Sequence, residues 1–151
     1  MKYTLETLRT IRKNTLNAME GLSVEELCKV PTGFKNSVLW NAAHNMVSLQ
    51  LLVYARSSVA SKVSQELIDK YRKGTEGPTS VSEEEISQIK SLMLSTVDDL
   101  EKDLANGVFN SYDEYLTSFG VNLTSAEEAI KFDCVHEGLH LGYIMAMKKS
   151  I

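Results

Sequence analysis

The chain has 151 residues, of which 43% are hydrophobic and 24% are charged, and its formal net charge is −4. A chain of this size folds around one core, so we expect residues 1–151 to form a single domain. An acidic chain without a basic patch gives no electrostatic case for nucleic acid, and no stretch approaches the roughly 20 apolar residues of a membrane span.

The first predicted helix covers roughly residues 4–21 and has apolar residues at helical spacing. Thr4 is its candidate N-cap and Gly21 is its stop signal. Its inward face is expected to carry Leu5, Leu8, Arg12, Leu16 and Met19. In the stretch GLSVEEL that follows, Ser23 stands three residues before Glu26, and this capping-box spacing predicts a short helical turn.

The second predicted helix starts near Asn36, a good N-cap, and runs to about Ala60. Its inward stripe is expected to carry Trp40, His44, Val47, Leu51 and Tyr54. The third predicted helix runs from about Ser82 to Asn106. The acids that follow Ser82 complete a capping box and lie at the positive end of the helix dipole.

The fourth predicted helix starts at Thr124 or Ser125 and continues to the end of the chain. Four amphipathic helices of roughly 18 to 25 residues predict an all-α fold, a four-helix bundle. Residues 61–81 form a long link between the second and third helices, which fits a crossover connection. No alternating apolar and polar run is long enough to support a sheet, although residues 111–119 could be extended.

All three histidines lie on core-facing stripes. His136 and His140 are four residues apart, so they stand one turn apart on the same helical face, and His44 lies in the middle of the stripe of the second helix. If the second and fourth helices are neighbours, the three imidazoles converge. Three neutral imidazoles on rigid helices suit zinc, nickel or another first-row divalent ion, with water in the remaining positions. The alternative is a histidine cluster that binds no metal.

Residues 136–140, HEGLH, have the H-E-x-x-H spacing of zinc peptidases. Those enzymes take a third ligand downstream of the motif, and here no His, Asp, Glu or Cys follows His140, so the third ligand must come from upstream. Glu137 is a candidate to orient a ligand or to act as a base on metal-bound water, and the alternative is a solvated side chain or a pair with a neighbouring helix. Asp133, one turn before His136, is a candidate partner of that histidine or a fourth ligand.

Two stretches resemble the DinB-like family. Residues 36–54, NSVLWNAAHNMVSLQLLVY, resemble its second-helix signature, and residues 136–144, HEGLHLGYI, resemble its last-helix motif. The resemblance implies an up-down-down-up bundle that uses the long 61–81 connection, and a divalent metal at His44, His136 and His140. It also implies a homodimer, which is common in the family. Some members are transferases or isomerases that use low-molecular-weight thiols, others are described as metal-dependent hydrolases, and many have no known activity.

A thiol transferase should place polar and basic groups around the metal. The candidates are Arg9, Arg12, Asn41, Asn45 and Arg56, with surface or capping roles as the alternative. Trp40 and Tyr143 are candidates to line a pocket for a cofactor, with simple core packing as the alternative.

Three kinds of function therefore remain open. The first is a metal-dependent transferase or hydrolase that acts on a small molecule. The second is a non-catalytic, stress-related protein that binds metal or ligand, and the third is a structural bundle with a polar histidine cluster. Cys28 and Cys134 are far apart in the sequence and the amino terminus lacks an apolar core of signal-peptide length, which indicates a reducing, cytoplasmic setting.

Overall fold

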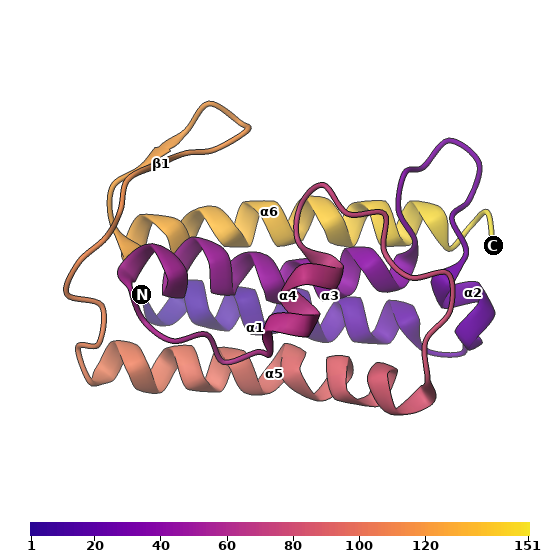
Figure 1. Cartoon of the computed structure of the whole chain (residues 1–151), viewed down its shortest axis with the longest axis horizontal. Helices are drawn as coiled ribbons and strands as arrows, with labels where there is room; N and C mark the ends of the chain where they lie inside the picture. The colour runs from indigo at the N-terminus through magenta and orange to yellow at the C-terminus, as the bar shows by residue number, and fades with distance from the viewer.

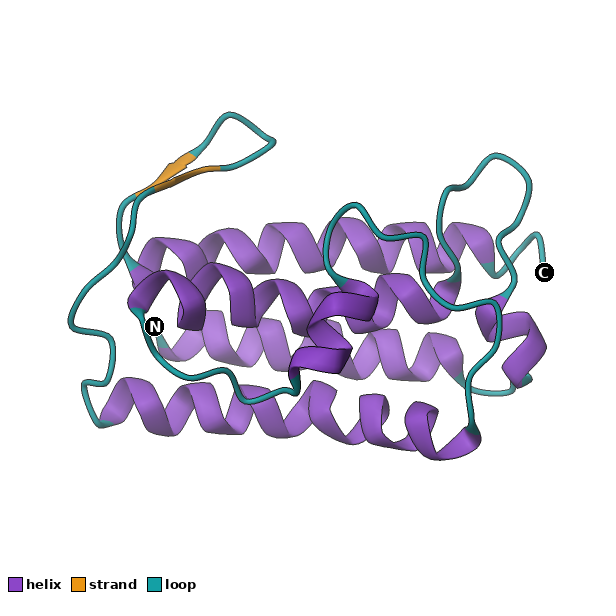
Figure 2. Cartoon of the chain, in the orientation of Figure 1, coloured by secondary structure: helices purple, strands orange, loops and turns teal.

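The computed structural model describes residues 1–151, and most of them are helical (Figures 1 and 2). The helical elements are α1 (Lys2–Met19), α2 (Val24–Cys28), α3 (Val38–Leu49), the π-helical turn η1 (Gln50–Tyr54), the 3-10 turn η2 (Ala55–Ser57), α4 (Gln65–Tyr71), α5 (Glu83–Ala105) and α6 (Ala126–Met147). The strands β1 (Tyr115–Leu116) and β2 (Asn122–Leu123) form one small antiparallel hairpin. The prediction of an all-α fold is confirmed.

The long helices α1, α3, α5 and α6 lie side by side (Figure 1). Helix α6 packs against α1 and α3, and α5 packs against the same two helices from another side. Their inward faces form two apolar clusters, one that contains Met46 and Met93 and one that contains Leu8 and Leu100. Burial of such side chains stabilises the fold by about 1.5 to 3 kcal/mol each. None of the helices has the length and apolar character that a membrane crossing requires.

Serine side chains cap most of the helices. Ser23 and Glu26 form the predicted capping box of α2, and Ser82 and Ser125 cap α5 and α6. The box at Ser82 is only half formed, because the carboxylate of Glu85 accepts hydrogen bonds from Tyr71 and Lys70 instead of from the cap.

Two predicted caps were wrong. Helix α1 begins at Lys2, so Thr4 lies inside it. Ser37, not Asn36, caps α3, and the amide of Asn36 donates to the carbonyl oxygens of Thr75 and Glu76. Asn36 and Ser37 are both residue types that can cap a helix. Which of them caps α3 depends on contacts with a loop that is distant in sequence.

The second predicted helix is not one continuous helix to Ala60. Regular α-helix ends at Leu49, and the chain continues through η1 and η2 until Ser58 adopts a left-handed backbone with φ 56°. The side chain of Gln50 is buried, and its oxygen accepts a 2.8 Å hydrogen bond from the backbone N–H of Lys62. A π turn contains an extra residue, so it shifts the helical phase of the residues that follow.

The connection between η2 and α5 contains a helix that the sequence pattern did not predict. Ser64 caps α4, which buries Leu67, Ile68 and Tyr71 against the bundle. In Figure 1 this connection runs back along α3 before α5 begins. The seven residues of α4 are too few for helical periodicity to be read with certainty, because that pattern needs several turns.

The loop after α4 is held against α3 by Trp40. The indole N–H donates a 2.8 Å hydrogen bond to Thr75 Oγ1. Gly77 has φ +84°, and a Cβ at this position would lie 2.5 Å from Cδ1 of the same indole. The close approach of backbone to ring therefore requires glycine.

We predict that Gly77→Ala destabilises the fold more than Gly74→Ala does. Gly74 also has a positive φ of +91°, but a Cβ there meets nothing within 4 Å. Gly74→Ala should therefore cost only backbone strain of about 1 to 2 kcal/mol, whereas Gly77→Ala adds about 1 to 3 kcal/mol of overpacking. Urea unfolding of both variants measures the difference, and equal losses would refute the packing argument.

Candidate metal centre

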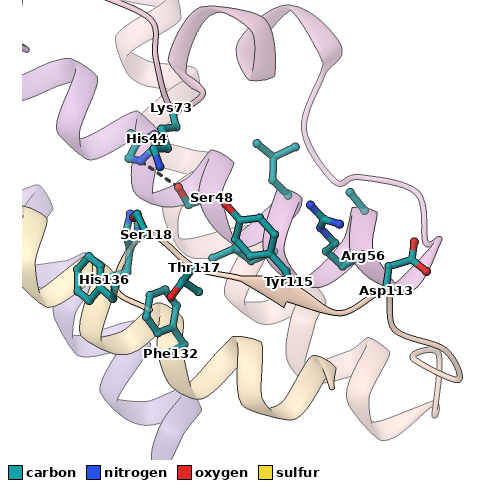
Figure 3. Close-up of a pocket in the computed structure, with 14 residues that line it drawn as sticks. His44, Ser48, Arg56, Lys73, Asp113, Tyr115, Thr117, Ser118, Phe132 and His136 are labelled. Atoms are coloured by element: carbon teal, nitrogen blue, oxygen red, sulfur yellow. Dashed lines mark hydrogen bonds between the residues drawn. The ribbon is translucent and has the colours of Figure 1, made fainter. Parts of the chain in front are cut away.

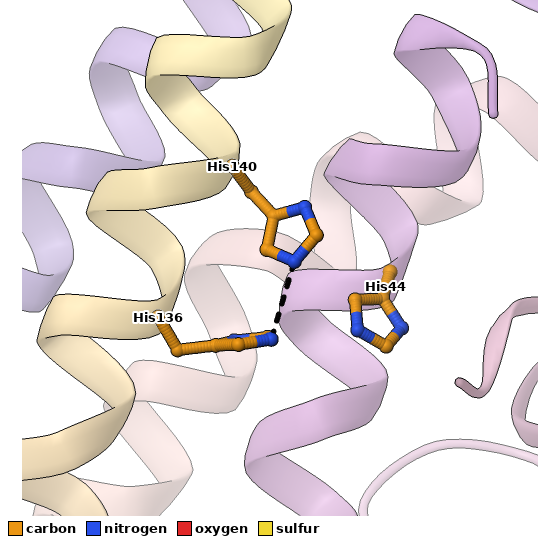
Figure 4. Close-up of side chains that lie close together, drawn as sticks. All are labelled: His44, His136 and His140. Atoms are coloured by element: carbon orange, nitrogen blue, oxygen red, sulfur yellow. Dashed lines mark hydrogen bonds between the residues drawn. The ribbon is translucent and has the colours of Figure 1, made fainter. Parts of the chain in front are cut away.

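The three histidines meet between α3 and α6 (Figure 4). The ring centroids lie 4.6 Å apart for His136 and His140, 4.9 Å for His44 and His140, and 5.2 Å for His44 and His136. One ring nitrogen from each residue lies within 4.8 Å of the others. The convergence that the helical faces predicted is therefore present.

Hydrogen bonds outside the cluster determine where the ring protons of His44 and His140 lie. Nδ1 of His44 is 2.8 Å from the carbonyl oxygen of Tyr71, and Nδ1 of His140 is 2.7 Å from Oδ1 of Asn41. The Asn41 amide nitrogen donates to the carbonyl of Ser37 at 2.8 Å, which turns Oδ1 toward His140. Because both oxygens can only accept, each Nδ1 carries the proton and each Nε2 presents its lone pair.

His136 differs from the other two rings, because a carboxylate lies behind it at a distance too long for a hydrogen bond. Its Nδ1 lies 3.7 Å from Oδ1 of Asp133, and none of Nδ1, Oδ1 and Oδ2 has a hydrogen-bond partner. When a metal ion takes the place of the Nε2 proton, the ring proton would lie on Nδ1 and face this fully buried carboxylate. Nε2 of His136 is 3.2 Å from Nε2 of His140, and because the His140 nitrogen carries no proton, the hydrogen bond between them takes its proton from His136 in the metal-free protein (Figure 4).

Burial keeps His44 and His140 neutral. Removal from water lowers the pKa of His44 to about 4 and that of His140 to about 3. Neutral imidazoles are the form that binds metal, and three of them suit a first-row divalent ion. A cation among the three Nε2 atoms would take the place of the proton between His136 and His140 and of the Ser48 hydroxyl at His44, so the residues present fit such an ion.

Glu137 does not face the histidines. Its carboxylate is fully buried and forms an ion pair with Arg12, with Nη2 to Oε1 at 2.6 Å and Nε to Oε1 at 2.9 Å. The Nη1 atom of Arg12 donates to the carbonyl of Met93 and to the hydroxyl of Thr96. Burial raises the pKa of Glu137, and Arg12 opposes that rise. Of the two roles expected for Glu137, the structure places it in a pair with a neighbouring helix.

The other predicted residues divide into two groups. Trp40 stacks on His44 with ring centroids 4.3 Å apart, Asn41 contacts His140, and the half-exposed Tyr143 lies 6.5 Å from His140. Arg9 lies elsewhere, in ion pairs with Asp98 and Glu101. Asn45 and Arg12 are fully buried and line neither of the cavities that open beside the histidines.

Two cavities open beside the histidines. The first, here the hairpin cavity, has a volume of about 410 Å³ and lies between η1 and the hairpin (Figure 3). The second, here the loop cavity, has a volume of about 440 Å³ and includes residues 33–36. Both are lined by His44, Lys73, Ser118, Phe119 and His136. Sequence reasoning missed the three of these that come from loops, because no periodic pattern links those loops to α3 and α6.

We predict that Arg12→Met destabilises the protein by about 3 to 5 kcal/mol, because it leaves the Glu137 carboxylate buried without its cation. Arg9→Met removes an exposed ion pair of the same chemistry and should cost less than about 1 kcal/mol. Urea unfolding of both variants tests the contrast. The double variant Arg12→Met with Glu137→Leu should recover most of the loss, and a double variant as unstable as Arg12→Met would contradict this explanation.

We also predict that the metal-free protein loses stability as the pH is lowered from 6.5 towards 4. An unfolded chain protonates histidine near pH 6.5, whereas folded His44 stays neutral to about pH 4, so the unfolded state binds more protons in this window. The slope should be about 1.4 kcal/mol per pH unit for each such histidine. Unfolding in urea with EDTA measures it, and His44→Gln should flatten the slope by that amount. A variant with the slope of the wild type would exclude His44 as a source.

Comparison with known proteins agrees with the family resemblance of residues 36–54 and 136–144, the two stretches that contain the histidines. A search among curated proteins gives no significant match. The family model described as the DinB superfamily matches residues 7–144, which include all of α3, most of α6 and all three histidines. Because this match spans most of the 151 residues, the chain belongs to the DinB superfamily.

Proposed function

We propose that this protein binds a divalent transition metal, zinc or nickel, through Nε2 of His44, His136 and His140. The observation that carries the proposal is the convergence of these three rings while Tyr71, Asn41 and Asp133 occupy their opposite sides. Histidines that bind metal usually donate their other N–H to a carbonyl or carboxylate, and this arrangement supplies such a partner for each ring.

We infer further that the protein is a metal-dependent transferase or hydrolase that acts on a small molecule. A bound metal ion lowers the pKa of a coordinated water or thiol. Three protein ligands leave positions for such a group, and the two cavities admit molecules of modest size. Ser48 lines the hairpin cavity, and its hydroxyl, 3.1 Å from His44 Nε2, is placed to hydrogen-bond a group bound beside that histidine.

One feature favours a thiol as the nucleophile over water. Arg12 holds the carboxylate of Glu137, and Asp133 is fully buried behind His136, so no carboxylate from α6 faces the cavities. Activation of water benefits from a base near the metal, whereas a thiol loses its proton more readily. We therefore place a low-molecular-weight thiol first among the candidate co-substrates.

The absence of an α6 carboxylate from the cavities also favours one competing function. A protein that only holds a metal ion or ligand needs no base, so a non-catalytic, stress-related binding role is the second candidate. Screening the zinc-loaded and nickel-loaded protein with thiols and small electrophiles separates the two. Consumption of the electrophile that depends on metal, thiol and His44 supports the enzyme, and metal binding without any turnover supports the second role.

The proposal includes three features of the whole molecule. The first is the up-down-down-up order of the long helices, which the course of the connection through α4 supports. The second is a homodimer, supported by the exposed apolar side chains Val135, Leu139 and Met145 on α6. The third is a cytoplasmic location, for which the free cysteines Cys28 and Cys134 are the support.

We predict that His44→Ala sharply lowers zinc affinity while helix content is retained, because it removes one of three ligands. Asp133→Asn should lower the affinity by about 10-fold to 100-fold through loss of the partner of His136. Wild-type binding should weaken as the pH approaches about 4, where protons begin to compete with the metal for His44. Calorimetric titration with zinc measures each effect, and circular dichroism verifies the fold. Asp99→Asn, a change at a partly exposed acid on α5, is the matched control.

Two results would refute the metal site. The first is less than about 0.1 equivalent of any transition metal in untagged protein from metal-supplemented cells, because the affinity of three imidazoles should retain far more. The second is a zinc affinity that is the same in wild type and His44→Ala.

A further inference from the structure

We propose that the hairpin cavity binds an elongated organic carboxylate, with its carboxylate on Arg56 and its other end at the histidines. This inference rests on the proposed function for the identity of the reacting end, and it adds a substrate class. Figure 3 shows the layout: His44 and His136 lie on one side of the cavity, and Arg56 and Asp113 lie on the other. Tyr115 and Phe132 lie between them, and Leu51 and Leu52 also line the cavity.

Arg56 is a cation with unused donors. Its guanidinium carbon lies 4.5 Å from the centroid of the Tyr115 ring, which holds the side chain in place. It makes no ion pair and no side-chain hydrogen bond, although it is half-buried in the wall of the cavity. Arginine with both a stacked face and free N–H groups suits bidentate recognition of an oxyanion.

The backbone around Arg56 is also held in place. Its carbonyl oxygen accepts a 2.7 Å hydrogen bond from the N–H of Asp113, which ties the base of the hairpin to η2. Tyr112 adds a second tie by donating to the carbonyl of Leu52 at 2.9 Å. The guanidinium is therefore presented from a braced segment of backbone, which lowers the entropy cost of binding.

The charge of the cavity walls is opposite to that of the chain. The formal net charge of the chain is −4, yet the cationic side chains Arg56, Lys73 and Lys35 line the two cavities and Asp113 is their only acid. Such a wall attracts anions. Because Asp113 shares the cavity with Arg56, the local balance suits a singly charged carboxylate better than a doubly charged phosphate.

The separation of the two ends requires a long ligand. Arg56 follows His44 by twelve residues along α3, η1 and η2, which is roughly 18 Å along a helix before side chains are counted. A short anion such as acetate cannot contact both ends at once. The apolar residues between them favour a ligand with an aliphatic or aromatic body.

The test uses probe molecules with a hydroxamate at one end of a carbon chain, because hydroxamates coordinate zinc. The group at the opposite end of the chain is varied. The probes are hydroxamates of a six-, eight- or ten-carbon chain that end in a carboxylate, a methyl group or a phosphonate, and they are titrated into zinc-loaded protein. For at least one length, the wild type should bind the carboxylate probe about tenfold more tightly than the methyl probe, the effect of one charge-assisted contact. Arg56→Gln should abolish this preference and leave zinc content and methyl-probe affinity unchanged. Arg72→Gln, a change at an exposed arginine outside both cavities, should retain it.

Each outcome is decisive for one of the two proposals. If zinc binds and no probe length shows a carboxylate preference, or if Arg56→Gln retains one, the Arg56 site is refuted and the metal site stands. Tighter binding of the phosphonate than of the carboxylate refutes the singly charged ligand. If zinc does not bind, octanoate is titrated into the metal-free protein, and binding that disappears in Arg56→Gln supports the anion site while equal binding in both proteins overturns it.

Discussion

The contact between α3 and α6 brings His44 against His136 and His140, and the proposed chemistry depends on it. The ring centroids lie within 5.2 Å of one another because the apolar faces of α3 and α6 pack together. Each of these faces carries histidine at a position that an apolar side chain would otherwise occupy. The cost of burying these rings is reduced by carbonyl partners on their outer sides. As a result the Nε2 atoms of His44 and His140 are left as acceptors that point towards the centre of the cluster.

Helix α6 separates two kinds of polar group on neighbouring parts of its surface. His136 and His140 face α3, whereas Glu137 faces Arg12 of α1. Asp133 lies between the two sets, one turn before each of His136 and Glu137 and fully buried. A change in either set can therefore affect the other through this carboxylate, so metal affinity and fold stability should be measured together in every α6 variant.

The cavities are built largely by the two long connections. The segment through α4 supplies Lys73, the hairpin supplies Ser118 and Phe119, and both meet above the histidines. The helices thus hold the candidate ligands rigidly, while the loops determine what reaches them. The same division would allow different ligands to be bound on one scaffold through changes in the loops.

The sequence by itself determined the helical class and the three histidine positions. It also determined the caps Ser23 and Ser82 and narrowed the cap of α6 to Thr124 or Ser125, because these features depend on residues within a few positions of each other. The two motifs that contain the histidines were sufficient to indicate the DinB resemblance, which the family match over residues 7–144 confirmed.

Only the tertiary structure decided the features that depend on distant partners. Arg12 looked like one member of an apolar stripe and became the buried partner of Glu137, and Arg56 obtained its ring from Tyr115 across the hairpin. The exchange of Asn36 for Ser37 as the cap followed from contacts with Thr75 and Glu76. Local periodicity carries no information about which distant side chain will satisfy a charge, because that choice is made only when the helices pack.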